Sequence, residues 1–177
     1  MKMLATAIRK GRMDLEITQE DFARLAGIDR GYMGGIERGE HNLTFAKLMV
    51  VLAGLGAHPS EFFRDFRLRD LRGPDHAVRQ VTLPAVLMKD ATDREILGAA
   101  VRAERQHAGF TQEGFARHAG LARSYMSGLE RGERNPTFTQ LVRILEALAV
   151  QPGDFFRHFP DSRKMPRRRR SQRQAED

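Results

Sequence analysis

The 177-residue sequence contains no cysteine and no long apolar run. The absence of cysteine excludes disulfides, thiolate zinc sites and cysteine catalysis, and it is typical of a reducing compartment. The longest apolar run, residues 48–57, is interrupted by Gly54 and Gly56, and it is far shorter than the roughly 20 residues of a membrane helix. Residues 1–10 also lack the apolar centre of a secretory signal. We therefore expect a cytoplasmic protein that has no membrane partner.

The sequence also lacks the motifs on which most enzymes depend. It has no glycine-rich phosphate loop, no nucleophile motif and no repeated pair of carboxylates. Its six histidines show no repeated ligand spacing, which argues against a metal site. We predict that the protein is not an enzyme, and we expect neither a cofactor nor a small-molecule ligand.

Basic residues outnumber acidic ones by 30 to 23, which gives a formal net charge of +7. Residues 161–177 contain seven basic and three acidic residues, so this segment supplies +4 of that charge. The excess fits a polyanionic partner. We predict that residues 160–177 form a disordered basic tail. Such a tail is solvated, binds phosphates without sequence specificity, or contacts another protein.

One segment occurs twice at a constant offset of 93 residues. Residues 4–66 align with residues 97–159 without a gap, and about half of the aligned positions are identical. Each copy is long enough to fold alone, so we interpret the pattern as the duplication of a small domain. We predict a first domain at 1–66, a linker at 67–96, a second domain at 97–159 and the tail at 160–177. The apolar residues 81–88 of the linker are expected to pack as an extended segment.

Apolar periodicity and capping residues predict five helices in each copy, and hence an all-α protein. The first helix is expected over 2–13 and 93–106, and the second begins at Thr18 or Thr111, whose hydroxyls can cap it. Gly27 and Gly120 end that second helix. The third helix is expected over 29–38 and 122–131, the fourth begins near residue 44 or 137, and a short fifth follows residue 59 or 152. The phenylalanines of this fifth helix are expected to pack in the core or at a domain edge; a groove for a partner is the alternative.

Two short helices joined by a tight turn that contains glycine form the helix-turn-helix signature. The first copy reads TQEDFARLAGIDRGYMGGIERGEHNLTF at 18–45, and the second reads TQEGFARHAGLARSYMSGLERGERNPTF at 111–138. Both copies resemble the lambda-repressor/Cro-like family, also called the XRE type. The resemblance covers about 126 of the 177 residues. It implies two compact five-helix domains whose third helix enters the major groove of duplex DNA.

The resemblance also implies which residues contact DNA. Gln19 and Gln112 match the phosphate-contacting glutamine of the family. Arg30 and Arg123 are the best candidates for reading a base, because a guanidinium can bind the O6 and N7 atoms of guanine together. The remaining candidates lie on the face of the third helix that we expect to point outward, where Tyr and Ser can also bind phosphate: Gly31, Tyr32, Gly34, Gly35, Ser124, Tyr125, Ser127 and Gly128.

Two charged pairs are assigned to structure rather than to DNA contact. Arg12 with Glu37, and Arg105 with Glu130, resemble the buried ion pair that joins helices one and three in the family. Breaking one side of such a pair costs about 3–5 kcal/mol when the pair is buried.

The two copies differ in their third helix, which contains three glycines in the first copy, at positions 31, 34 and 35. Each interior glycine costs roughly 1 kcal/mol of helix propensity and offers no side chain to a groove. We therefore expect the second copy to read DNA more strongly. The first copy could read weakly, bind only the DNA backbone, or serve as an interaction domain.

These observations lead to a sequence-specific transcriptional regulator, in particular a repressor, as the main hypothesis. The chain could occupy two half-sites of duplex DNA as a covalent pseudo-dimer, since a 30-residue linker can span about 100 Å when extended. A homodimer formed through the phenylalanines or through residues 81–88 is a candidate assembly. The alternative function is a protein-interaction module, such as an antitoxin or an assembly subunit.

Overall fold

The computed structural model describes residues 1–68 and 91–159. All regular secondary structure in these residues is helical, apart from one isolated bridge, so the predicted all-α class is confirmed. The linker residues 69–90, which include the segment 81–88, and the tail 160–177 lie outside the described residues. The described helices form two similar groups, which we call the first unit and the second unit.

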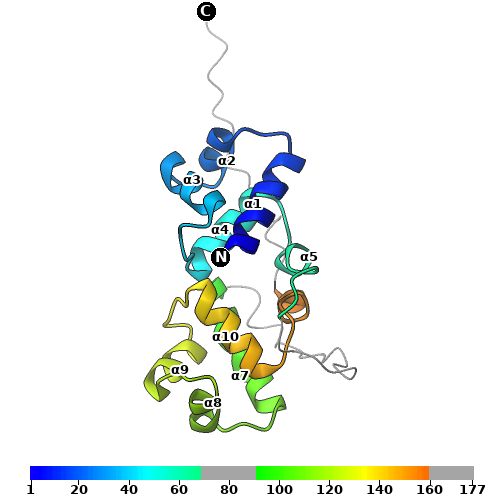
Figure 1. Ribbon diagram of the computed structural model, residues 1–177. Helices are drawn as coiled ribbons and strands as arrows, with labels where there is room; N and C mark the ends of the chain where they lie inside the picture. Colours follow the sequence, from blue (N-terminus) through cyan, green and yellow to red (C-terminus); the bar gives the residue numbers. More distant parts are fainter. Residues whose placement is uncertain (69–90, 160–177) are drawn as a thin grey trace, which may run out of the picture.

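The first unit has five helices (Figure 1). They are α1 (Lys2–Asp14), α2 (Gln19–Leu25), α3 (Arg30–Arg38), α4 (Phe45–Gly54) and α5 (Pro59–Phe62). The second unit repeats this order with α7 (Asp93–His107), α8 (Gln112–His118), α9 (Arg123–Glu130), α10 (Phe138–Leu148) and α11 (Pro152–Phe155), followed by a short 3-10 turn, η1 (Phe156–His158). None of the described helices is long and apolar enough to cross a membrane.

Local sequence accounts for the helix boundaries. Thr18 and Thr111 accept hydrogen bonds from the third amide of α2 and α8, as predicted. Thr137 and Gln140 form the predicted capping box at the start of α10. Gly27 and Gly120 have positive φ angles of 61° and 62°, which a glycine adopts without a steric penalty.

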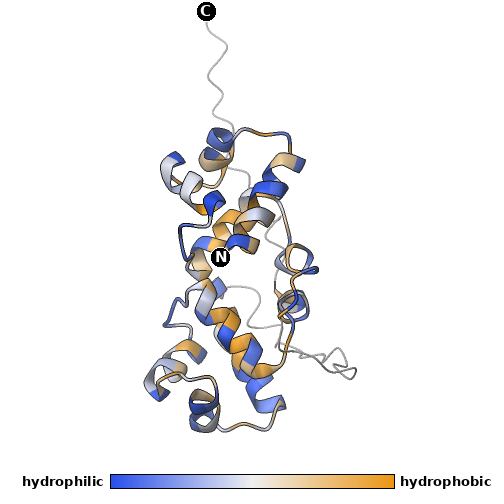
Figure 2. Cartoon of the chain, viewed as in Figure 1, coloured by the Kyte–Doolittle hydropathy of each residue, from blue (hydrophilic) through white to orange (hydrophobic). Residues whose placement is uncertain are grey.

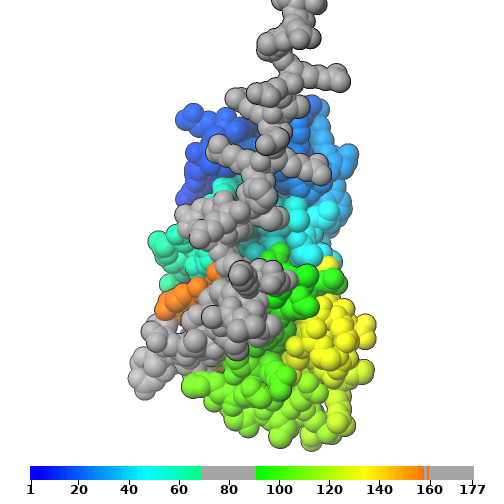
Figure 3. Space-filling model, turned by 180° about the vertical axis from the view of Figure 1, so that it is seen from behind, coloured from blue at the N-terminus to red at the C-terminus, as the bar shows by residue number. Residues whose placement is uncertain are grey.

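The apolar residues of both units form one continuous core. In Figure 2 they gather along α4 and α10, in the middle of the molecule. Helix α4 of the first unit contacts both α7 and α10 of the second, and α5 packs against α11. Figure 3 shows the same pairing from behind, with the end of the second unit lying beside the α5 region. The two units therefore pack directly on each other.

The contact between the units is reciprocal. The amide of Phe45 donates to the carbonyl of Pro136 (2.7 Å), and the amide of Phe138 donates to the carbonyl of Leu43 (2.6 Å). The 93-residue offset of the repeat converts one bond into the other, because Phe45 corresponds to Phe138 and Leu43 corresponds to Pro136. Thr44 forms a bridge with its own counterpart Thr137. A self-pair of this kind marks the position of a local twofold axis.

Asn42 and Asn135, each two residues before one of these threonines, form a second pair of reciprocal contacts. Asn135 accepts from the amide of Ala46 (3.0 Å), and Asn42 accepts from the amide of Thr139 (3.3 Å). Each asparagine therefore caps the helix of the opposite unit. The interface is isologous in form, although both halves belong to one chain.

Phenylalanines of the fifth helices lie on the same axis. The rings of Phe63 and Phe156, which are counterparts, stack at 5.3 Å between centroids. Phe63 also stacks on Phe138 at 6.0 Å, and Phe45 stacks on Phe156 at 6.2 Å. All four side chains are buried, so the packing role expected for the fifth-helix phenylalanines is confirmed for Phe63 and Phe156. Burying each ring stabilises the fold by up to about 3 kcal/mol.

Candidate nucleic-acid interface

The turn between the second and third helices has the same geometry in both units. In the first, the amide of Ile28 donates to the carbonyl of Ala23 (2.8 Å) and closes α2 beyond Gly27. Asp29 then accepts from the amide of Tyr32 (3.0 Å) and begins α3. In the second unit the equivalent closing bond joins Leu121 to Ala116 (2.8 Å). Each turn fixes the third helix at a set angle to the second.

A buried ion pair connects the third helix to the first in each unit. The guanidinium of Arg12 lies 2.7 Å from the carboxylate of Glu37, and that of Arg105 lies 2.6 Å from Glu130. Arg12 also donates to the carbonyl of Ile17 (2.8 Å), which ties down the loop before α2. These contacts hold the recognition helix in place from its inner side.

The predicted phosphate-binding glutamines join the same networks. The amide nitrogen of Gln19 donates to Glu37 (2.9 Å), and that of Gln112 donates to Glu130 (2.9 Å). A carboxamide nitrogen carries two hydrogens, so the bond to the glutamate uses only one of them. The sequence did not suggest that Glu37 and Glu130 would orient the glutamines.

The electrostatics of Glu37 follow from this arrangement. Burial raises the pKa of its carboxyl, but the hydrogen bonds from Arg12 and Gln19, with the charges of Arg12 and Arg9, outweigh burial and lower the pKa. The carboxyl in turn raises the pKa of Arg12 through their hydrogen bond. The pair is therefore charged when the chain is folded at neutral pH.

The two candidate base-reading arginines are exposed. The side chain of Arg30 is 71% exposed and that of Arg123 is 73% exposed. Each pairs with a glutamate of the preceding helix, Arg30 with Glu20 at 3.1 Å and Arg123 with Glu113 at 3.6 Å. Exposed pairs of this kind contribute little free energy. Both arginines can therefore leave the glutamate at small cost.

The predicted exposure of three glycines is wrong. Gly34, Gly35 and Gly128 are buried because longer side chains lie over them. A β-carbon at Gly34 would be 3.0 Å from the guanidinium of Arg38. His41 covers Gly35, and Arg134 covers Gly128 at the equivalent position. Gly31, Ser124 and the half-buried Ser127 remain on the accessible side of their helices.

The tyrosines of the third helices have different neighbours. Tyr32 stacks on His41 at 4.3 Å between ring centroids, with the Lys47 ammonium 5.6 Å from its ring. Tyr125 has the Arg134 guanidinium 6.0 Å from its ring, and its hydroxyl donates to Gln140 (3.3 Å). Sequence reasoning missed these neighbours, although His41 and Arg134 occupy equivalent positions in the repeat.

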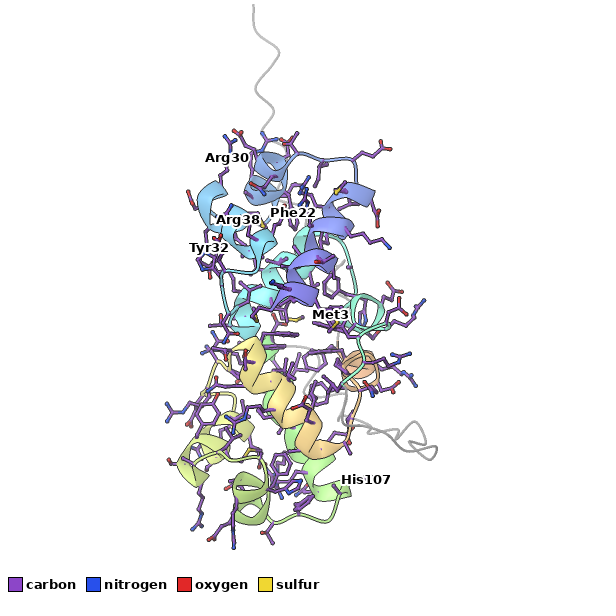
Figure 4. The ribbon with its side chains drawn as sticks, in the orientation of Figure 1. Met3, Phe22, Arg30, Tyr32, Arg38 and His107 are labelled. Atoms are coloured by element: carbon purple, nitrogen blue, oxygen red, sulfur yellow. The ribbon has the colours of Figure 1, made fainter. Side chains whose placement is uncertain are left out.

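The exposed sides of α3 and α9 lie along the same edge of the molecule. Figure 1 shows both helices on one side of the ribbon, and Figure 3 shows the same edge from behind. In Figure 4 the side chains of Arg30 and Tyr32 reach outward at this edge, whereas Phe22 points into the interior. Among residues 1–68 and 91–159, no cluster of acidic or histidine side chains could hold a metal ion.

Comparison with protein families gives a match in each unit. Residues 8–62 match a helix-turn-helix family, and residues 96–158 match a second family described as a helix-turn-helix domain. The two matches fall on the two copies of the repeat.

Individual relatives align over about the length of one copy. The chain is 39% identical over 57 residues to the HTH-type transcriptional regulator y4dJ of Sinorhizobium fredii, a match that covers 32% of this chain and 74% of the relative. It is 44% identical over 62 residues to the HTH-type transcriptional regulator YazB of Bacillus subtilis, covering 35% and 90%. It is 41% identical over 58 residues to the control protein C.MunI of a Mycoplasma species, covering 33% and 76%.

Among solved structures, the restriction-modification controller protein C.AhdI of Aeromonas hydrophila matches with 36% identity and a TM-score of 0.35. The match covers 36% of this chain and 97% of that protein.

Proposed function

The chain belongs to the XRE-type helix-turn-helix family of DNA-binding transcriptional regulators, and from that premise we propose that it represses transcription by occupying promoter DNA as a single-chain pseudo-dimer. Helices α3 and α9 enter two successive major grooves on one face of the duplex. The proposed role requires no catalysis, cofactor or small ligand, and duplex DNA as the partner fits the cytoplasmic location expected from the sequence.

The observation that carries this proposal is the reciprocal contact between the units. A local twofold axis at Thr44 and Thr137 relates the first unit to the second. Duplex DNA has local twofold axes of its own, so two recognition helices related in this way can meet equivalent groove positions. We propose that residues 1–66 and 97–159 act as the two DNA-binding domains and that residues 67–96 connect them.

Within each domain we propose separate tasks for the exposed residues. Arg30 and Arg123 read bases. Gln19 and Gln112 bind phosphates through the second N–H of their side-chain amide, since the first N–H donates to Glu37 or Glu130. Tyr32 and Tyr125, placed beside basic side chains, help to bind the DNA backbone.

A second candidate function is a protein-interaction module in which the first unit no longer reads DNA. The glycines at 31, 34 and 35 favour it, because they leave α3 with few side chains to offer to a groove. This module would bind DNA weakly and without sequence preference.

The test is a binding titration with sequences selected from a random DNA pool, at several salt concentrations, together with the mass of the complex. We expect one chain per operator, a preference of several kcal/mol over random DNA, and weaker binding as salt rises. Two chains per operator would indicate a homodimer and refute the single-chain assembly. Binding without any sequence preference would support the interaction module.

Arginine variants test whether the two candidate base-reading residues contribute to specific binding. Arg123→Ala should weaken specific binding by about tenfold or more, and Arg30→Ala should weaken it less. Arg157→Ala is a matched control, because Arg157 pairs with Asp154 near α11 and lies outside the recognition helices. Equal losses for all three variants would show that only net charge matters.

A further inference from the structure

The local twofold axis relates the positions of the two recognition helices but not their side chains. Both helices begin with an exposed arginine paired to a glutamate. At the next exposed position α3 has Gly31, whereas α9 has Ser124. The recognition surfaces therefore start alike and then diverge.

A second difference lies one turn further along. Ser127 is half-buried, and its hydroxyl accepts a hydrogen bond from Arg131. Its counterpart, Gly34, is buried beneath Arg38. A serine hydroxyl can donate to or accept from either a base edge or a phosphate, and glycine has no such group. At these three positions α9 therefore has an arginine and two serines, whereas α3 has an arginine and two glycines.

The flanking groups differ as well. Beside α9 the guanidinium of Arg134 lies against Tyr125. Beside α3 the imidazole of His41 stacks on Tyr32, with the ammonium of Lys47 5.6 Å from the same ring. A guanidinium is permanently charged and can grip a phosphate with two parallel bonds. The second unit therefore has the richer base-reading surface, and its tyrosine is flanked by a guanidinium where that of the first unit is flanked by an imidazole and an ammonium.

A homodimer presents two identical surfaces and so selects a palindrome, because its subunits are interchangeable. In this chain the surfaces differ, and reciprocal bonds between Asn42, Asn135 and the opposite helices hold them in one arrangement. We propose that the DNA ligand is an asymmetric operator, made of two different half-sites, in which the half-site under α9 carries most of the sequence information. This inference rests on the proposed DNA-binding function.

The test begins with the selected operator. Full-length wild type is used to select bound sequences from a random pool, and the half-site whose recognition is lost in Arg123→Ala is named A, the other B. Three duplexes with unchanged spacing, A–B, A–A and B–B, are then titrated with full-length protein. We expect A–A to bind within about threefold of A–B, and B–B to bind at least about tenfold more weakly, the cost of losing base contacts under α9.

A variant that makes α3 resemble α9 supplies an independent measurement. Gly31→Ser combined with Gly34→Ser places both hydroxyls on α3, and Ser127 already occupies the equivalent position beside Arg131. This variant should prefer A–A over A–B by about fivefold or more. The matched control is Gly31→Ala with Gly34→Ala, which adds the same β-carbons without hydroxyls and should keep the wild-type preference. Circular dichroism establishes that both variants are folded.

The outcomes separate this inference from the function on which it rests. A palindromic selected site, equal binding to A–A and B–B, or a serine variant that behaves like its alanine control overturns the asymmetric operator while leaving DNA binding intact. Failure to select any sequence overturns the proposed function itself.

Discussion

Buried charge at single residues fixes the orientation of each recognition helix. Only 4% of the Glu37 side chain and 13% of the Arg12 side chain are exposed. Removing one partner of a buried pair costs about 3–5 kcal/mol, since the other charge is left without compensation. The position of α3 therefore depends on a residue of α1 that lies on the inner side of the domain.

Replacing Glu37 by Gln should make the free energy of unfolding less dependent on pH in the acid range. In the folded chain, burial raises the pKa of Glu37, but bonds from Arg12 and Gln19 outweigh burial and lower it. A carboxyl with a lowered pKa contributes stability above the ordinary glutamate pKa and loses it as the pH falls through the folded value. The variant should be less stable by about 3–5 kcal/mol at pH 7, and the difference should shrink toward pH 3.

Urea unfolding of both proteins between pH 7 and pH 3 measures this difference. Glu40→Gln is the control, because Glu40 forms an exposed pair with Arg38 and such pairs contribute little. A Glu37→Gln difference that stays constant over the whole pH range would contradict the assignment.

A second prediction concerns the close approach of α7 and α9 at Gly98. A β-carbon there would overlap the carbonyl oxygen of Leu129 and lie 2.9 Å from that of Glu130. Gly98→Ala should lower the free energy of unfolding by about 1–3 kcal/mol, since the helices must move apart. It should also weaken DNA binding, because α9 shifts. Denaturant unfolding and DNA titration check the two effects.

The first unit provides the control for Gly98, because it has Ala5 at the equivalent position. Ala5→Gly should cost only about 1 kcal/mol, through helix propensity. If Gly98→Ala proved as stable as the wild type, the close packing of α7 on α9 would be refuted.

Much of the local structure could be predicted from the sequence because the interacting groups are neighbours in the chain. Thr137 and Gln140 are three residues apart, and Gly120 comes two residues after His118, the last residue of α8. The burial of Gly34 and Gly35 could not be predicted in this way. It depends on the conformations of the Arg38 and His41 side chains, which lie over these glycines. Helical periodicity predicts which way a residue faces but not the conformation of a neighbouring side chain.

At the scale of elements, the N-termini of α4 and α10 stabilise each other. The first three amides of a helix have no partner within the helix. In α4, the amide of Phe45 donates to Pro136 of the other unit, that of Ala46 to Asn135, and that of Lys47 to Thr44 of its own unit. Two of the three partners thus come from a segment about 90 residues away in the chain.

The predicted effect of Asn135→Ala therefore appears in the opposite unit. Amide hydrogen exchange at the start of α4 should become about fivefold faster, because the variant removes one cap, worth roughly 1 kcal/mol. Exchange at the start of α10 should change less. Asn42→Ala is the reciprocal control and should have the reverse pattern, since Asn42 accepts from Thr139 of α10. Faster exchange confined to the mutated unit would contradict the crossed caps.

At the scale of the whole molecule, the two units form one body with a shared core. The sequence allowed a wide range of separations, because a 30-residue linker restricts the distance between domains only weakly. The structure instead shows direct contact through Phe63, Phe156 and the bonds around Thr44 and Thr137. The repeat could not reveal this contact, since two copies of a surface look the same in the sequence whether or not they touch.

A rigid arrangement predicts a strict requirement for operator spacing. Inserting five base pairs between the half-sites turns one of them by about half a helical turn, and inserting ten restores the face but adds about 34 Å. Both insertions should weaken binding by about 100-fold or more, since only one domain can then bind. Gel-shift titration of the three duplexes tests this expectation. Recovery of affinity with ten base pairs would indicate domains that swing on a flexible tether.

The shared core also determines how such a regulator responds to its own abundance. Two separate subunits must first meet, so the occupancy of their site rises steeply only above a threshold. In this chain the partner is always present, because Phe63 and Phe156 are joined by the polypeptide itself. Dilution cannot separate the halves, and occupancy should follow a simple hyperbola. Even a few molecules per cell would then produce a graded response without a lag for assembly.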